Sequence, residues 1–403
     1  MSRAPLALTL PTDGAASTRR VLIRMVKKMA RDAVRLTPTL FPAHLEDSVH
    51  EVQALLRGFG TQDPRPLYAA LRCAHVHVLL TCTLRSMNEG DAESAGKRAQ
   101  EFYVALLTEL AAMKALPRPI SWSSRPPHGV LSSATYGICH PVPDDVASLV
   151  FDAGVVILHG THTRRLTLDQ VDPEAFDPIE PGLVLSLFDV NPISDFEAHP
   201  DKAGNQLDLG DATADEWKRV LSESLQLIET YLPETRAEMR VVLQQFIPVG
   251  TDEHQHLSAS YREAIGVVYL TLHPHIMTMT EAVIHEFQHN KLNALFHLDD
   301  VMHNAFHPLY TSPVRPDPRP LHGVLLAAHA FVPVAELYRR MRDASDPQST
   351  RGRFESRFAE IIQKNHQAIE VLENADPTER GAEVLRELRE IHDTHLALGV
   401  WNP

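Results

Sequence analysis

The stretch VIHEFQHNKL, from Val283 to Leu292, places His285 and His289 four residues apart, with Glu286 directly after the first histidine. Residues four apart on an α-helix project from the same face, so both imidazoles can reach one metal ion. Neutral imidazole is a ligand for zinc, iron, copper and nickel alike. The stretch therefore predicts a helix that holds a metal ion.

The sequence on either side of this stretch predicts the surroundings of that helix. AIGVVYLTL, from Ala264 to Leu272, is rich in β-branched residues and predicts a strand. Thr278 is expected to be the N-cap of the next helix, in a capping box with Glu281 three residues later. A second long helix is expected from Leu321 to about Met341. We expect an α+β, mainly helical fold in which these two helices form a metal site beside a small β-sheet.

The two histidines need a third protein ligand to complete a metal site. His322, His329 and Glu336 are spaced by seven in the second helix and nearly eclipse one another on one face. His329 lies among apolar residues, where an imidazole needs a polar partner, and it is the first candidate for the third ligand. A buried core histidine with an ordinary hydrogen bond is the alternative. Glu336 is the carboxylate candidate, and His297 and His303 are further ones.

Hydrophobic periodicity divides the chain into three regions. Apolar residues three and four apart predict a helical N-terminal region, residues 1–125. The Pro- and Ser-rich stretch PRPISWSSRPPHG, residues 117–129, is interpreted as a boundary. GVVILHGTHTRRLTL and GLVLSLFDV predict strands in a β-rich section, residues 126–211. Residues 212–403 are expected to form the metal-binding catalytic region, covered by amphipathic helices between Phe354 and Leu398.

Composition excludes several classes of protein. A formal charge of −14 over 403 residues argues against nucleic-acid binding. Cys73, Cys82 and Cys139 form no CxxC pair and cannot all pair with one another, which indicates a reduced, cytoplasmic compartment. The N-terminal apolar run is interrupted by prolines and is a poor signal peptide. No stretch approaches the ~18 uninterrupted apolar residues of a membrane-spanning helix. The sequence does not indicate the oligomeric state.

Three blocks of sequence resemble one known family. HEFQHNKLNAL (His285–Leu295), SPVRPDPRP (Ser312–Pro320) and GVLLAAHAFVPVAELYRR (Gly323–Arg340) follow one another in the order typical of the HExxH-type peptide β-hydroxylases. These are 2-oxoglutarate-dependent iron enzymes associated with ribosomally synthesised peptide natural products. The resemblance implies that this protein uses Fe(II), 2-oxoglutarate and O₂ to hydroxylate the β-carbon of a residue in a precursor peptide.

The resemblance also implies roles for individual residues. Fe(II) would be held by His285, His289 and a third side chain, with His329 as the candidate, which leaves positions for 2-oxoglutarate and O₂. The far carboxylate of 2-oxoglutarate needs a fixed cation, and a guanidinium can donate two parallel hydrogen bonds to it. Arg319 is the first candidate, and Arg315 and Lys291 follow. Each loop arginine has an alternative partner in Asp317 or solvent.

Two alternatives use the same histidines differently. In a zinc metallopeptidase, Glu286 would be the general base toward water and Glu336 the third ligand. In an iron site, Glu286 would instead support the ligands from outside the coordination sphere. The second alternative is a non-catalytic peptide-binding protein whose metal is structural.

Overall fold

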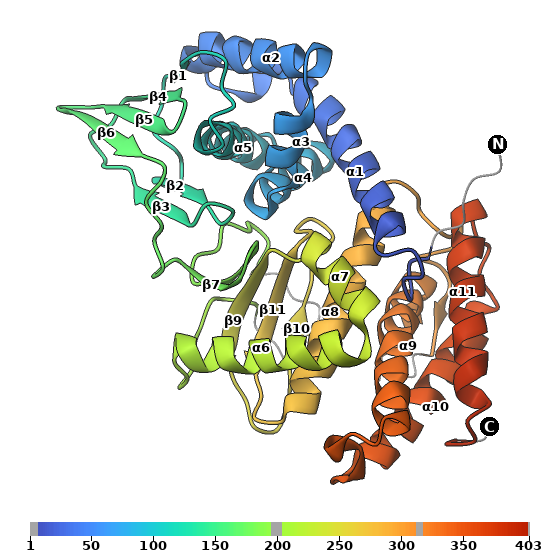
Figure 1. Ribbon diagram of the computed structural model, residues 1–403. Coiled ribbons are helices and arrows are strands. Elements are labelled where there is room, and N and C mark those ends of the chain that lie inside the picture. Colours follow the sequence, from blue (N-terminus) through green and yellow to red (C-terminus); the bar gives the residue numbers. More distant parts are fainter. Residues whose placement is uncertain (1–6, 195–203, 312–316, 402–403) are drawn as a thin grey trace.

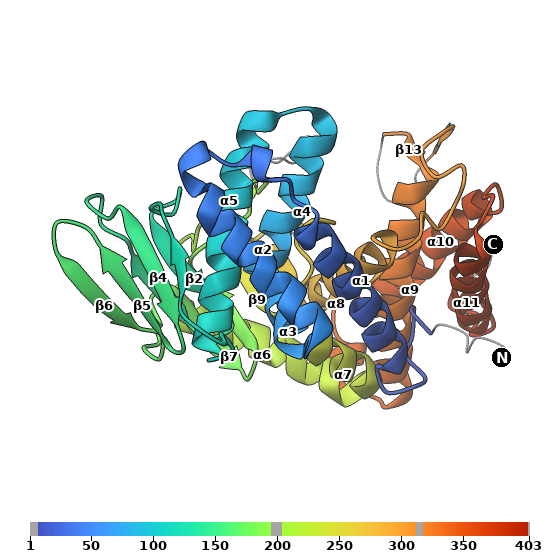
Figure 2. The same cartoon turned by 90° about the horizontal axis from the view of Figure 1, so that it is seen from above.

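The computed structural model describes residues 7–194, 204–311 and 317–401. The fold is α+β and mainly helical, as the sequence predicts. Figure 1 shows N-terminal helices with small sheets beside them, a larger central sheet, and a group of C-terminal helices. In the view from above, the small sheets and the C-terminal helices lie at opposite ends of the molecule, with the N-terminal helices between them (Figure 2).

The N-terminal helical region confirms the periodicity of its sequence. α1 buries Val21, Leu22, Met25 and Met29 on one side, at positions spaced as the apolar pattern predicts. The helices of this region are α1 (Ala16–Val34), α2 (Glu46–Thr61), α3 (Arg65–Arg72), α4 (Ala74–Glu89) and α5 (Ala92–Ala112).

Small antiparallel sheets follow these helices, and they correct one interpretation of the sequence. The Pro- and Ser-rich stretch is more than a boundary, because its residues Ile120–Trp122 form strand β1. Ile120 and Trp122 are fully buried, and β1 pairs with β4 in a sheet of order β1-β4-β5-β6. A separate hairpin joins β2 to β3. The strands are β1 (Ile120–Trp122), β2 (Val130–Ser133), β3 (Ile138–Pro141), β4 (Ser148–Asp152), β5 (Val155–His159) and β6 (Thr163–Thr167).

The largest sheet has the strand order β10-β11-β9-β8-β7. Strand β9 is parallel to both of its neighbours, whereas the two edge strands are antiparallel to theirs. The sheet joins strands from both sides of the boundary expected at residue 211, and the three-domain division stays a prediction. The strands are β7 (Phe176–Glu180), β8 (Leu183–Ser186), β9 (Gln245–Thr251), β10 (Ser258–Ala259) and β11 (Val267–Leu272).

The remaining helices build the region around the HExxH motif. Thr213 and Glu216 form a capping box at the start of α6. A two-stranded hairpin, β12 with β13, lies between α8 and α9 in the chain. The elements are α6 (Ala214–Tyr231), α7 (Pro233–Val242), α8 (Ile276–Phe296), β12 (Leu309–Tyr310), β13 (Arg319–Pro320), α9 (Leu321–Asp343), α10 (Phe354–Leu372) and α11 (Glu379–Leu396).

Helices α8 and α9 pack against each other in opposite directions. The rings of Phe296 and His322 lie 4.5 Å apart at one end of the contact. At the other end, the Tyr338 hydroxyl donates a hydrogen bond of 2.5 Å to Glu281. The order of residues along α9 is therefore the reverse of the order along α8.

A continuous apolar core extends from the N-terminal segment to α11. Among the described residues, α9 is the one helix long and apolar enough to cross a membrane, and 78% of its most apolar window is buried inside the protein. Helices α3 and α4 pass the same test only if taken together, across a bend of 82°. A buried core helix has these properties in a soluble protein, and the cytoplasmic location stays a prediction.

Candidate metal centre

Helix α8 carries the HExxH motif, but it begins differently from the sequence-based expectation. Its N-cap is His275, and Thr278 lies inside the first turn, so the predicted capping box is wrong. Glu281 has other partners: it accepts hydrogen bonds from the Tyr338 hydroxyl and, at 2.7 Å, from the guanidinium of Arg357. These contacts tie α8 to α9 and α10.

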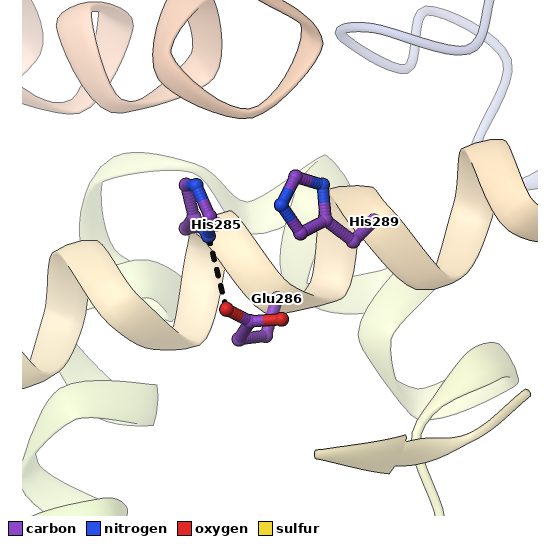
Figure 3. Close-up of side chains that lie close together, drawn as sticks. All are labelled: His285, Glu286 and His289. Carbon is purple, nitrogen blue, oxygen red and sulfur yellow. Dashed lines mark hydrogen bonds and ion pairs between the residues drawn. The ribbon is translucent and has the colours of Figure 1, made fainter. Parts of the chain in front are cut away.

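His285 and His289 lie side by side on one face of α8 (Figure 3). Their ring centroids are 4.2 Å apart, and one ring nitrogen from each lies within 4.8 Å of a carboxylate oxygen of Glu286. The His285 side chain is 23% exposed. His289 has a buried Nδ1 atom without a hydrogen-bond partner. An unsatisfied buried nitrogen beside a second imidazole fits a ligand pair for a metal ion.

The carboxylate of Glu286 lies beside the two imidazole rings, in direct contact with His285 (Figure 3). The Ser258 hydroxyl donates a hydrogen bond of 2.6 Å to one of its oxygens, and the Ser260 hydroxyl donates one of 2.6 Å to the other. His285 Nδ1 lies 3.1 Å from the first oxygen. Because an ionised carboxylate only accepts, the proton of this bond lies on His285 Nδ1, which leaves Nε2 with its lone pair.

The charge states of these residues suit the binding of a cation. Burial acts to raise the pKa of Glu286, but its contacts with His285, with His289 and with Ser258 hold the pKa well below the usual range. Burial lowers the pKa of His289 to about 3, and the neighbouring His285 acts in the same direction. The site thus combines an ionised carboxylate with a neutral imidazole at neutral pH, the state in which imidazole binds a metal.

Asn290 fixes α8 against strand β11. Its amide oxygen accepts a hydrogen bond of 2.7 Å from the Gly266 amide, and its amide nitrogen donates to the Val267 carbonyl and to Ser260. Gly266 has a φ of +100°, and a Cβ there would lie 3.0 Å from the Val242 carbonyl, so glycine is needed. This contact holds the start of β11 in register with the motif helix.

His329, the candidate third ligand, lies outside the group formed by His285, Glu286 and His289. Its Nε2 lies 3.0 Å from the Leu8 carbonyl, while its Nδ1 is buried without a partner. Burial lowers its pKa to about 3, and the charges of Lys291 and of His289 contribute. His329 therefore lies close to the motif helix, beside the backbone of Gln288, with one nitrogen bonded to the N-terminal segment, and its role as a metal ligand stays a prediction.

Glu336 and His322 have partners away from the histidine pair. Glu336 accepts hydrogen bonds from the guanidinium groups of Arg339 and Arg340, and from His395 at 3.1 Å. This carboxylate is satisfied, which contradicts its use as a third metal ligand. The His322 ring contacts the rings of Phe296 and Phe306, with centroids 4.5 Å and 5.2 Å away. The further candidate His297 contacts the Arg262 carbonyl at 2.7 Å, while His303 is likewise absent from the group.

Of the three predicted cations, the two that the structure describes have acidic partners outside this group. Lys291 is a correction: its fully buried ammonium pairs with the equally buried Glu238 at 2.5 Å, so it is not free to bind 2-oxoglutarate. Arg319 lies 2.9 Å from Asp317 in a loop pair, the alternative that the sequence left open. Arg315 lies outside the described residues.

A cavity of about 370 Å³ opens beside His285, and most of its lining was not foreseen from the sequence. Helix α8 contributes Thr278, Glu281, Ala282 and His285, and α9 contributes Phe331. The other walls consist of His256, Leu257 and Ser258 before and within β10, and of Arg357, Ile361 and Lys364 on α10. The stretch HLSAS (residues 256–260) could have indicated this wall from the sequence, because alternate residues of an extended segment point to the same side.

No protein-family model and no curated protein matches this chain. The function proposed for the centre therefore depends on its own geometry and on the family resemblance of the motif blocks.

Proposed function

We propose that this protein is an Fe(II)- and 2-oxoglutarate-dependent oxygenase that hydroxylates the β-carbon of a residue in a ribosomally made precursor peptide. His285 and His289 would bind the iron, and His329 would complete the ligand set through a ring nitrogen. The donor set fits Fe(II), because imidazoles on one face leave coordination positions open for other ligands. Iron bound there supplies the oxidation chemistry, in which 2-oxoglutarate and O₂ yield succinate, CO₂ and a hydroxylated carbon.

The position of Glu286 carries this proposal. Hydrogen bonds from Ser258, Ser260 and His285 engage both of its oxygens. A metal-binding histidine commonly donates its other N–H to a carboxylate, which orients the ring and increases its basicity. Glu286 fits that supporting role, because both of its oxygens already accept hydrogen bonds, whereas a general base needs an oxygen available to a water molecule beside the metal.

The remaining residues of the site bind, orient and exclude water. Glu286 fixes the tautomer of His285, and Phe331 packs on the same ring with centroids 5.0 Å apart. Phe331 also forms an apolar wall of the cavity beside His285. Such a wall reduces water access to the reacting carbon.

A spectroscopic titration tests the proposal. The purified protein is loaded with Fe(II) without oxygen, and 2-oxoglutarate is added while visible absorption is recorded. We expect a broad band from the chelated keto acid, its loss in His289→Ala, and its weakening in His329→Ala. After oxygen is admitted, a precursor peptide should gain the mass of one oxygen atom.

Other outcomes would support the alternatives. Protein that retains zinc, gives no band and cleaves peptides would favour a metallopeptidase. In that case Glu286→Gln should abolish cleavage, whereas the same substitution only weakens an iron site. Peptide binding without any change in peptide mass, under every metal and co-substrate condition, would favour a non-catalytic peptide-binding protein.

A further inference from the structure

Two cations of α10 line the cavity beside the metal centre. The cavity beside His285 contains the side chains of Arg357 and Lys364, seven residues apart on α10. Neither was expected from the sequence, where both belong to a helix interpreted as a cover. This placement raises the question of which ligand they would bind.

The two cations differ in how firmly they are held. Arg357 donates to Glu281 at 2.7 Å and lies 3.1 Å from Glu360, so both faces of its guanidinium are engaged. Among the described residues Lys364 pairs only with Glu360, at 2.7 Å, and its side chain is 35% exposed. An ammonium group has three donors, so Lys364 can bind a second carboxylate without breaking a buried ion pair.

Lys364 also lies toward the metal-binding end of the cavity. Tyr338 on α9 contacts Glu281 on α8 and stacks on Phe354 at the start of α10, with centroids 4.5 Å apart. Phe331, two turns earlier on α9, contacts His285 and shares the cavity with Lys364. Helices α8 and α10 therefore leave the Tyr338 contact in the same direction.

Distances along α8 and α10 place His285 and Lys364 at similar positions along the cavity. His285 lies four residues beyond Glu281, about 6 Å along α8, and Lys364 lies seven residues beyond Arg357, about 10 Å along α10. Glu281 and Arg357 form an ion pair, so they mark one common level. Lys364 then lies slightly beyond His285 across a cavity of about 370 Å³, which is large enough for a small dicarboxylate.

We propose that Lys364 binds the far carboxylate of 2-oxoglutarate in the cavity beside His285. This inference rests on the proposed function and names the site of its co-substrate. Ile361, Ala282 and Phe331 give this cavity an apolar lining, which suits the methylene carbons of the keto acid. The co-substrate would thus enter between α8 and α10, and Arg319 would have no direct part in binding it.

The test compares two keto acids of equal chain length. Fe(II)-loaded protein without oxygen is titrated with 2-oxoglutarate, and separately with 2-oxopentanoate, which lacks the far carboxylate. The visible band gives a dissociation constant for each, independently of turnover. Lys364→Met should weaken the binding of 2-oxoglutarate about 10- to 100-fold, the range expected for one charged hydrogen bond, and should leave 2-oxopentanoate unchanged. Lys364→Arg should restore most of the loss.

One control variant and one rival variant make the result specific. The control, Lys28→Met, removes another half-exposed lysine in an i,i+4 ion pair, with Asp32 at 3.0 Å, and should change neither constant. The rival, Arg319→Ala, removes the arginine that pairs with Asp317, and if Lys364 binds the far carboxylate it should leave both constants within about twofold. Circular dichroism of every variant would verify that it is folded.

The outcomes separate the two proposals. If the parent protein binds 2-oxoglutarate and Lys364→Met binds it equally well, the assignment of Lys364 is overturned while the proposed function stands. The same holds if Arg319→Ala alone weakens binding. If the Fe(II)-loaded parent gives no band with either keto acid, the proposed function fails and the assignment of Lys364 fails with it.

Discussion

The buried ion pair between Lys291 and Glu238 gives a prediction whose magnitude follows from the structure. Both side chains are 0% exposed, and Lys291 Nζ lies 2.5 Å from one carboxylate oxygen of Glu238. The Thr18 hydroxyl donates to the other oxygen at 2.6 Å. Lys291→Met would leave the Glu238 carboxylate buried with one hydrogen bond and no counter-charge. Removing one partner of a buried pair costs about 3–5 kcal/mol, and the remaining bond from Thr18 places the loss near the lower value.

Urea unfolding measures this loss directly. Trp217 is fully buried on α6, which packs against α8, so its fluorescence reports the unfolding of this region. We expect Lys291→Met to unfold at a clearly lower urea concentration than the parent. The exposed Lys28→Met is the matched control and should lose less than about 1 kcal/mol. A double variant, Lys291→Met with Glu238→Leu, should recover most of the stability, because neither charge is then buried alone.

One result would refute the structural role of Lys291. If Lys291→Met unfolds at the same urea concentration as the Lys28→Met control, the Lys291 ammonium is not held by Glu238 in solution. A simultaneous loss of 2-oxoglutarate binding would then return Lys291 to the ligand role that the sequence suggested.

Three further predictions follow from the hydrogen bonds and the buried histidines. Ser258→Ala removes one donor to Glu286, and we expect about a 10- to 100-fold loss of metal affinity by calorimetry, whereas an unchanged affinity would contradict the supporting role of that carboxylate. Glu387 accepts hydrogen bonds from three consecutive backbone amides of the N-terminal segment, so Glu387→Ala should destabilise the protein by about 1–3 kcal/mol and accelerate proteolysis there, as mass spectrometry would show. Burial lowers the pKa of His75 to about 4 and of His329 to about 3 in the folded protein. A histidine in the unfolded chain has a pKa of about 6.5, so the unfolded chain binds more protons than the folded protein below that pH. Each such histidine should reduce stability by up to about 1.4 kcal/mol per pH unit as the pH falls from about 6.5 toward 4, and a flat urea midpoint over that range would contradict their burial.

The long helices could be predicted from sequence because their apolar residues recur over many turns. Both α8 and α9 were expected, and α9 begins at the predicted Leu321. Strand β9 was not expected, since its sequence QFIPVGT begins with a glutamine and contains Pro248, although it lies inside the sheet. Its burial comes from strands on both sides, one of which lies about sixty residues earlier in the chain. Such long-range pairing overrides local preference.

The histidine spacing was visible in the sequence, whereas the partners of the charged side chains were not. Lys291 appeared as a free cation because nothing nearby in the sequence pairs with it, yet Glu238 on α7 neutralises it. Glu281 appeared as part of a helix cap and is instead bound to Arg357 on α10. Periodicity gives the face on which a residue lies, but the tertiary packing of helices distant in sequence determines which charge it meets.

The chemistry of an HExxH helix depends on the hydrogen-bond partners of its glutamate. A general base in a metallopeptidase accepts a proton from the water molecule beside the metal, so at least one of its oxygens has to reach that water molecule. In this chain the extended segment before β11 presents Ser258 and Ser260 to the same carboxylate, and breaking either bond in a buried site costs about 1–3 kcal/mol. A glutamate held by both hydroxyls and by His285 is a rigid acceptor. For the proposed function, the residues that distinguish oxygenation from hydrolysis would therefore be Ser258 and Ser260, which lie outside the HExxH motif common to both reactions.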